Sequence, residues 1–155
     1  MSVIQFNSLS EEQKAILIQA PVYIAYLIGG ADNNFDEKEV EVAKYTVNLR
    51  KNVGDPFLFD YYALAAENFN EQLDVLVAKY ENLEAAARTS LLIEELQKVN
   101  DIFPQVDSLY AKTLLNSWKS FAREVAAASG GFLGMLSVSY EEEHFLDLGM
   151  INPID

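Results

Sequence analysis

Apolar residues recur at helical spacing along most of this chain. No stretch shows sustained two-residue alternation, the pattern of a half-buried strand, so a sheet is not expected. The clearest stripe has apolar residues four and seven positions apart: Val106, Tyr110, Leu114, Phe121 and Val125. The sequence therefore predicts an all-α protein.

Few residues interrupt this pattern. The 155 residues include only four prolines and seven glycines, which favours long helices. Half of the residues are apolar, and the length suits one domain with a sizeable core. We expect a single domain over residues 1–155, built as a compact bundle of about seven helices.

Local signals place the ends of the first helices. Ser10 to Gln13 form a capping box, and Pro21 is expected to kink or briefly break the helix that follows. Residues 22–28 are apolar on nearly every side, which is typical of a helix at the centre of a bundle. Asp36 is expected to cap the next helix, with Glu39 as its reciprocal partner.

Further signals place the other helices. In the second half of the chain, Pro104 is expected to open the most regular helix and a capping box at Ser139 the last one. The charged residues Glu84, Arg88, Glu94, Glu95 and Lys98 are expected on a solvated side. The expected helices cover residues 56–80, 83–103, 104–129 and 139–149.

The charge of the chain restricts its partners. Twenty-four acidic residues against 11 basic ones give a formal charge of −13, which repels phosphate backbones and argues against direct nucleic-acid binding. Cations, basic peptides or a basic partner protein remain open, and so does a second copy of the chain. Acidity that serves only solubility is the simplest interpretation.

Two further absences bear on chemistry and location. The chain has no cysteine, which excludes disulfides, thiolate nucleophiles and zinc–sulfur sites. No secretion signal is visible at the N-terminus, and the apolar run 15–31 is short for a membrane span and contains Gln19 and Pro21. A cytoplasmic protein without membrane insertion is expected.

The turn that follows Gly30 is the strongest candidate for a functional site. Asp32, Asn34 and Asp36 have the spacing of the first three ligands of an EF-hand loop. Glu37 stands where that loop needs glycine, and Ala43 stands where it needs a bidentate glutamate. The turn is therefore not an EF-hand.

A looser divalent-cation site remains open at this turn. Its candidate ligands are Asp32, Asp36, Glu37 and Glu39. The alternative needs no metal, because Asp36 and Glu39 are already explained as the two halves of a capping box. No other cofactor is expected.

Catalytic patterns are missing. Glu141 and His144 have the Glu-x-x-His spacing of di-iron bundles, but such a site needs two of these elements and His144 is the only histidine. There is no Gly-x-Ser-x-Gly elbow and no phosphate-binding glycine loop. We expect a protein that is not an enzyme.

Two segments share one plan of apolar helix, glycine pair, turn and capping box. They are residues 15–39 and 121–142. This echo is compatible with two pseudo-symmetric helical hairpins and, almost equally, with chance similarity of two capping boxes.

Residues 9–12, 20–22 and 30–39 resemble the TerB-like family of tellurite-resistance-associated proteins. Ala31, Asp32, Phe35 and Glu39 match the family's motif, whereas Asn33 replaces its usual glycine. Residues 138–142 are similar to the family's second, more degenerate copy. The resemblance covers the first fifty residues best.

This resemblance implies a compact helical protein of the bacterial cytoplasm without established catalysis. It also implies cation binding or a role in stress-response complexes, which would involve Asp32, Asp36, Glu37 and Glu39. Our first hypothesis is accordingly a non-enzymatic acidic scaffold that binds a partner protein. The alternatives are a carrier of a small apolar ligand near Pro21 and residues 61–62, and a carboxylate-dependent hydrolase.

Overall fold

The computed structural model describes residues 3–30, 37–128 and 145–154, and all regular structure in these ranges is helical. The α-helices are α1 (Glu11–Gly29), α2 (Glu37–Leu49), α3 (Phe59–Tyr80), α4 (Ala85–Gln97), α5 (Val99–Ile102) and α6 (Ser108–Ala127). The 3-10 helices are η1 (Ile4–Phe6), η2 (Pro56–Leu58) and η3 (Phe103–Gln105). The all-α prediction is confirmed. The predicted count of seven helices is not, and most of the expected last helix lies outside the described residues.

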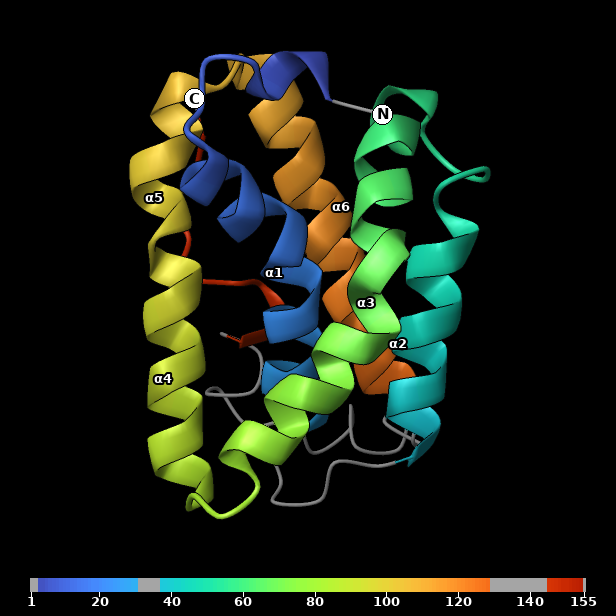
Figure 1. The fold of residues 1–155 in the computed structure, drawn as a ribbon, viewed down its shortest axis with the longest axis vertical. Helices are drawn as coiled ribbons and strands as arrows, with labels where there is room; N and C mark the ends of the chain where they lie inside the picture. Colours follow the sequence, from blue (N-terminus) through green and yellow to red (C-terminus); the bar gives the residue numbers. More distant parts are fainter. Residues whose placement is uncertain (1–2, 31–36, 129–144, 155) are drawn as a thin grey trace.

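Helix α1 occupies the centre of the bundle (Figure 1). It packs against α3, α6, α4 and α2, and every residue from Val22 to Gly29 except Tyr23 is buried. An apolar surface on all sides of a helix is stabilised only where other helices cover each side. The prediction that residues 22–28 form the central helix is confirmed.

The N-terminus of α1 is closed by the predicted capping box. The Gln13 backbone N–H donates to Ser10 Oγ at 3.1 Å, and the Ser10 backbone N–H donates to Gln13 Oε1 at 3.0 Å. These two bonds satisfy donors that the helix itself cannot pair.

Pro21 does not break α1, which runs unbroken through that residue. Because proline has no N–H, the carbonyl of Leu17 loses its partner one turn earlier in the helix. The Tyr61 hydroxyl of α3 donates to this carbonyl at 2.6 Å and replaces the lost bond. Of the predicted kink or short break, the break is therefore wrong, and a side chain from another helix restores the missing hydrogen bond.

The same hydroxyl joins a third helix to the pair. Trp118 Nε1 of α6 donates to Tyr61 Oη at 3.1 Å, and both side chains are fully buried. A buried hydrogen-bond chain of this kind is satisfied at every atom only if α1, α3 and α6 keep one relative register. Burial also raises the pKa of Tyr61 well above its usual value, so the hydroxyl stays protonated.

Aromatic rings fill the space around this chain. Tyr61 packs edge-on against Phe6 and Tyr62, and Trp118 stacks on Phe103 with ring centroids 5.4 Å apart. The rings of Phe6, Tyr61, Phe103 and Trp118 thus pack together in the core near Pro21.

Two local predictions are wrong. Helix α6 begins at Ser108 with Asp107 as its cap, because Pro104 lies in η3 and Val106 is extended. Arg88, expected on a solvated side, is buried. The predicted stripe of α6 is confirmed, since Tyr110, Leu114, Phe121 and Val125 are all buried.

None of the helices in the described ranges is long and apolar enough to cross a membrane.

Two tyrosine-to-phenylalanine variants test the hydrogen-bond chain. Tyr61→Phe leaves the Leu17 carbonyl and Trp118 Nε1 without a partner, so we expect a loss of about 2–4 kcal/mol in the free energy of unfolding. Tyr110→Phe is the matched control, because the buried Tyr110 hydroxyl has no hydrogen-bond partner among the described residues. Removing it should leave stability unchanged or raise it by up to about 1 kcal/mol. Urea unfolding measures both, and equal losses in the two variants would contradict this role of Tyr61.

Candidate functional site

The predicted cation ligands are not assembled among the described residues. Asp32 and Asp36 lie outside the described ranges. Glu37 is exposed at the start of α2, whereas Glu39 is buried in its first turn. In the part of the chain that the structure describes, no three Asp, Glu or His side chains are grouped to hold a metal ion.

A buried arginine that the sequence did not indicate lies at the beginning of the same turn. Arg88 of α4 is only 8% exposed, donates from Nη2 to the Gly30 carbonyl and places its guanidinium 5.1 Å from the centre of the Tyr26 ring. A cation at the C-terminus of α1 satisfies an unpaired carbonyl and opposes the negative end of the helix dipole.

Close packing at this corner also requires Gly30. A Cβ atom there would lie 2.9 Å from the Tyr26 carbonyl oxygen and 3.2 Å from Arg88 Nη2. The positive charge of Arg88 therefore lies beside Gly30, the last described residue of this segment, and opposes the binding of a metal ion close to Gly30.

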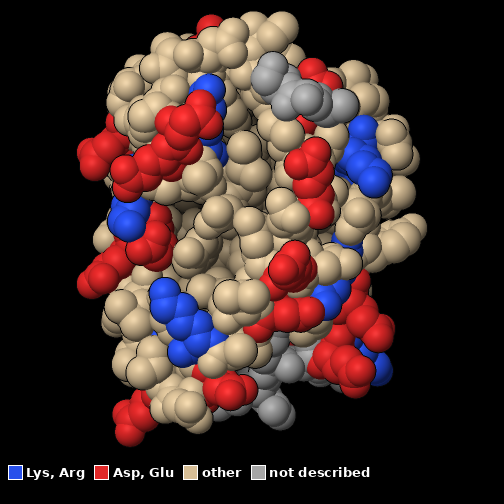
Figure 2. Space-filling model, in the orientation of Figure 1, with Lys and Arg blue, Asp and Glu red and all other residues tan. Residues whose placement is uncertain are grey.

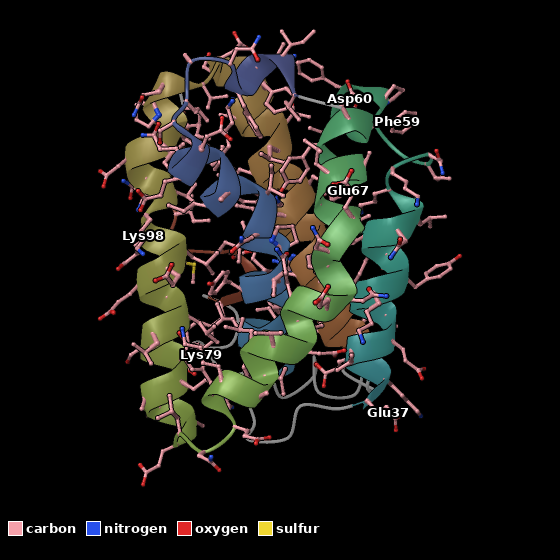
Figure 3. All side chains as sticks on the ribbon, viewed as in Figure 1. Glu37, Phe59, Asp60, Glu67, Lys79 and Lys98 are labelled. Carbon is pink, nitrogen blue, oxygen red and sulfur yellow. The ribbon has the colours of Figure 1, made fainter. Side chains whose placement is uncertain are left out.

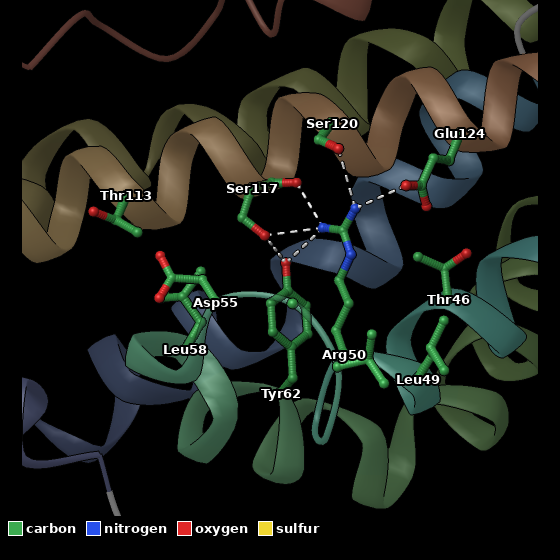
Figure 4. A pocket seen from close by; sticks show the side chains of 12 residues that line it. Thr46, Leu49, Arg50, Asp55, Leu58, Tyr62, Thr113, Ser117, Ser120 and Glu124 are labelled. Atoms are coloured by element: carbon green, nitrogen blue, oxygen red, sulfur yellow. Dashed lines mark hydrogen bonds and ion pairs between the residues drawn. The ribbon is translucent and has the colours of Figure 1, made fainter.

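A second candidate site lies at the C-terminal end of α2. A cleft of about 410 Å³ lies between α2, η2 and α6 (Figure 4), a volume within the range of small-molecule sites. Its lining includes aliphatic side chains (Leu49, Val53 and Leu58). It also includes polar side chains, which are Thr46, Arg50, Asp55, Tyr62, Thr113, Ser117, Ser120 and Glu124.

Arg50, directly after α2, is the central residue of this cleft. Its Nη1 donates to the Tyr62 hydroxyl at 3.1 Å, to the Ser117 carbonyl at 2.8 Å and to Ser117 Oγ at 2.9 Å. Its Nη2 has longer contacts, 3.2 Å to Ser120 Oγ and 3.3 Å to Glu124 Oε1. One side of the guanidinium is thus held firmly by the protein, and the other faces more exposed partners.

The two ion-pair partners differ in exposure. The Arg50 side chain is 14% exposed and that of Glu124 is 48% exposed. The guanidinium also lies 5.6 Å from the centre of the Tyr62 ring and 5.9 Å from that of Phe121. Arg50 therefore joins the end of α2 to α3 and α6, whereas Glu124 is held mainly by this one ion pair.

Asp55 stands at the other end of the cleft, near Thr113 (Figure 4). Its Oδ1 accepts a hydrogen bond from the Phe57 backbone N–H at 2.9 Å and thereby caps η2. Gly54 before it has φ +110°, a conformation that side chains disfavour, so the chain turns sharply into the cap.

A third feature is a shallow groove of about 390 Å³ between α1 and α3, which we call the α1–α3 groove. Its apolar lining is formed by Val22, Tyr23, Val75 and Leu76, and Glu71 also lines it. Figure 2 shows acidic side chains gathered on both sides of a hollowed, largely uncharged strip on this face. Figure 3 places Glu67 of α3 and Lys98 of α4 on opposite sides of α1.

Tyr23 links this groove to α4. Its pKa is raised, first by burial and then by the nearby negative charge of Glu95. Glu95 is itself paired with Lys98 at 2.9 Å. An acidic residue of α4 thus lies near Tyr23, although a lysine neutralises part of its charge.

Comparison of the chain with known protein families, characterised proteins and solved structures finds no match. The resemblance to the TerB-like family stays a prediction. Function is therefore inferred from the geometry and charge of the described residues.

Two substitutions in the Arg50 cleft test which contacts are structural. Arg50→Lys removes the forked donors that reach Tyr62, Ser117 and Ser120 together, and should lower the free energy of unfolding by about 1–3 kcal/mol. Glu124→Gln breaks only a half-exposed ion pair and should cost less than about 1 kcal/mol. Thermal and urea unfolding check both values. A larger loss in Glu124→Gln than in Arg50→Lys would show that the ion pair, not the fork, joins α2 to α6.

Proposed function

We propose that the protein is a non-enzymatic acidic scaffold that binds a basic, amphipathic segment of a partner protein in the α1–α3 groove. The observation that carries this proposal is an exposed aliphatic side chain, Val75, in a groove bordered by acids. Val75 is 61% exposed, beside the buried side chains of Val22 and Leu76.

Charge supports a basic partner. The chain has 24 acidic against 11 basic residues, so a cationic segment is attracted before any contact forms. Glu67 and Glu71 are one helical turn apart on α3, and Glu71 lines the groove. Lys79 is the basic residue in that lining, and a partner that avoids it would place its own charges toward Glu67 and Glu71.

The shape of the α1–α3 groove suits an amphipathic segment of a partner better than a flat partner surface. The groove is long enough on α3 to include Asn68, Gln72 and Lys79, which are spaced by four and seven residues. A partner helix that places an apolar stripe over Val75 would remove that side chain from water and leave its basic face toward the acids. Burial of such a side chain contributes about 1–2 kcal/mol to binding.

A synthetic helical peptide of lysine and leucine with an amphipathic pattern tests the proposal. Fluorescence anisotropy should show binding that weakens as salt rises, and Val75→Ser should reduce affinity by about fivefold because apolar burial is lost. Glu71→Gln should reduce the salt dependence of binding.

Leu109→Ser is the matched control, since Leu109 is equally exposed but lies at the start of α6, away from the groove. It should leave affinity unchanged. A scrambled peptide of the same composition controls for charge alone. Equal binding of both peptides, or equal effects of the two serine variants, would contradict the proposal.

Membership of the TerB-like family is part of this proposal, supported by the all-helical fold and by the matching residues Ala31, Asp32, Phe35 and Glu39. That family would place the protein in the bacterial cytoplasm and in stress-response complexes. The proposal also includes cation binding by Asp32, Asp36, Glu37 and Glu39, which can be tested separately. The spacing of these acids supports it.

Thermal melting with calcium, magnesium or zinc tests the cation site. A bound cation should raise the melting temperature of the native protein, and Asp32→Ala/Asp36→Ala should abolish that shift. Glu94→Ala/Asp101→Ala removes two acids elsewhere and should preserve it. Absence of a shift in the native protein, or the same shift in both double variants, would reject the site.

A further inference from the structure

The cleft around Arg50 is independent of the proposed partner groove and has the features of a ligand site. Its charges stand at opposite ends, with Asp55 beside Thr113 at one end and the Arg50–Glu124 pair at the other (Figure 4). We infer that this cleft binds a small zwitterionic molecule, with its amine at Asp55 and its carboxylate at Arg50.

The carboxylate end follows from the contacts of the guanidinium. Nη1 has three acceptors within 3.1 Å, so this side is saturated by the protein. Nη2 is held by two longer contacts, and the ion-pair partner Glu124 is half exposed. Release of such a side chain to water costs little, so a ligand carboxylate can replace Glu124 on Nη2.

The amine end follows from the contacts of Asp55. One carboxylate oxygen accepts a hydrogen bond from the Phe57 N–H, which fixes the side chain at the N-terminus of η2. The second oxygen keeps its lone pairs for a cationic donor, since Asp55 has no ion pair in the described part of the chain. A rigid carboxylate beside an open cleft is well placed to accept from an ammonium group.

The charge count of the lining selects the ligand class. One positive residue (Arg50) and two negative ones (Asp55 and Glu124) line the cleft. A phosphate-bearing ligand would be repelled by this set, whereas a zwitterion complements each end. Leu49, Val53 and Leu58 offer an aliphatic wall for a methylene chain between the two charged groups.

Isothermal titration of the full chain with ε-aminocaproate, caproate and hexylamine tests the inference. ε-Aminocaproate should bind about tenfold more tightly than either probe that lacks one charge, because each end adds a charge-assisted hydrogen bond. Dissociation constants below the millimolar range for all three probes would contradict the need for both charges. No detectable heat from ε-aminocaproate at millimolar concentration would overturn the proposal.

Two variants that keep Arg50 test which end of the cleft binds the amine and which end binds the carboxylate. Asp55→Asn keeps the cap of η2 and should reduce ε-aminocaproate binding to the level of caproate while leaving caproate unchanged. Glu124→Gln removes the competing carboxylate and should strengthen binding of ε-aminocaproate and caproate by about three- to tenfold, but not that of hexylamine. Asp101→Asn is the control for a surface acid outside the cleft. If neither cleft variant changes any affinity, the site is wrong.

Discussion

The arrangement of the bundle depends on one interaction, the hydrogen bond from Tyr61 to the carbonyl that Pro21 leaves unpaired. Proline inside a central helix would expose a polar group to an apolar core, where an unpaired carbonyl is costly. Trp118 completes the chain by donating to the same hydroxyl. Three helices are thereby held in one register, and this register determines the shape of the clefts between them.

Two arginines near the ends of helices likewise donate hydrogen bonds to backbone carbonyls of another part of the bundle. Arg88 reaches the carbonyl of Gly30, the C-cap of α1, and Arg50 reaches a carbonyl and hydroxyls of α6 from the end of α2. In an acidic chain these cations are largely withdrawn from the surface, which increases the negative charge that a partner meets. The same withdrawal places a guanidinium inside a cleft, where its charge is less screened than at the surface.

The α1–α3 groove and the Arg50 cleft thus differ in their chemistry. The α1–α3 groove combines an exposed aliphatic side chain with acidic borders, which suits a macromolecular partner of opposite charge. The Arg50 cleft is polar at both ends and aliphatic between them, which suits a small molecule. Neither feature uses the acids of residues 32–39, so the cation hypothesis is separate from both.

The sequence by itself determined the helical class, the central position of residues 22–28, the cap at Ser10 and the buried face of α6, because these follow from local spacing and hydrogen bonding within a few residues. Only the tertiary structure decided that α1 continues through Pro21, that Arg88 is buried and that Arg50 pairs with α6 in a cleft. Each of these depends on a contact between helices that are distant in sequence, and helical periodicity carries no information about which helices meet. The candidate acids of residues 31–39 were visible in the sequence, whereas both clefts arise only where helices pack together.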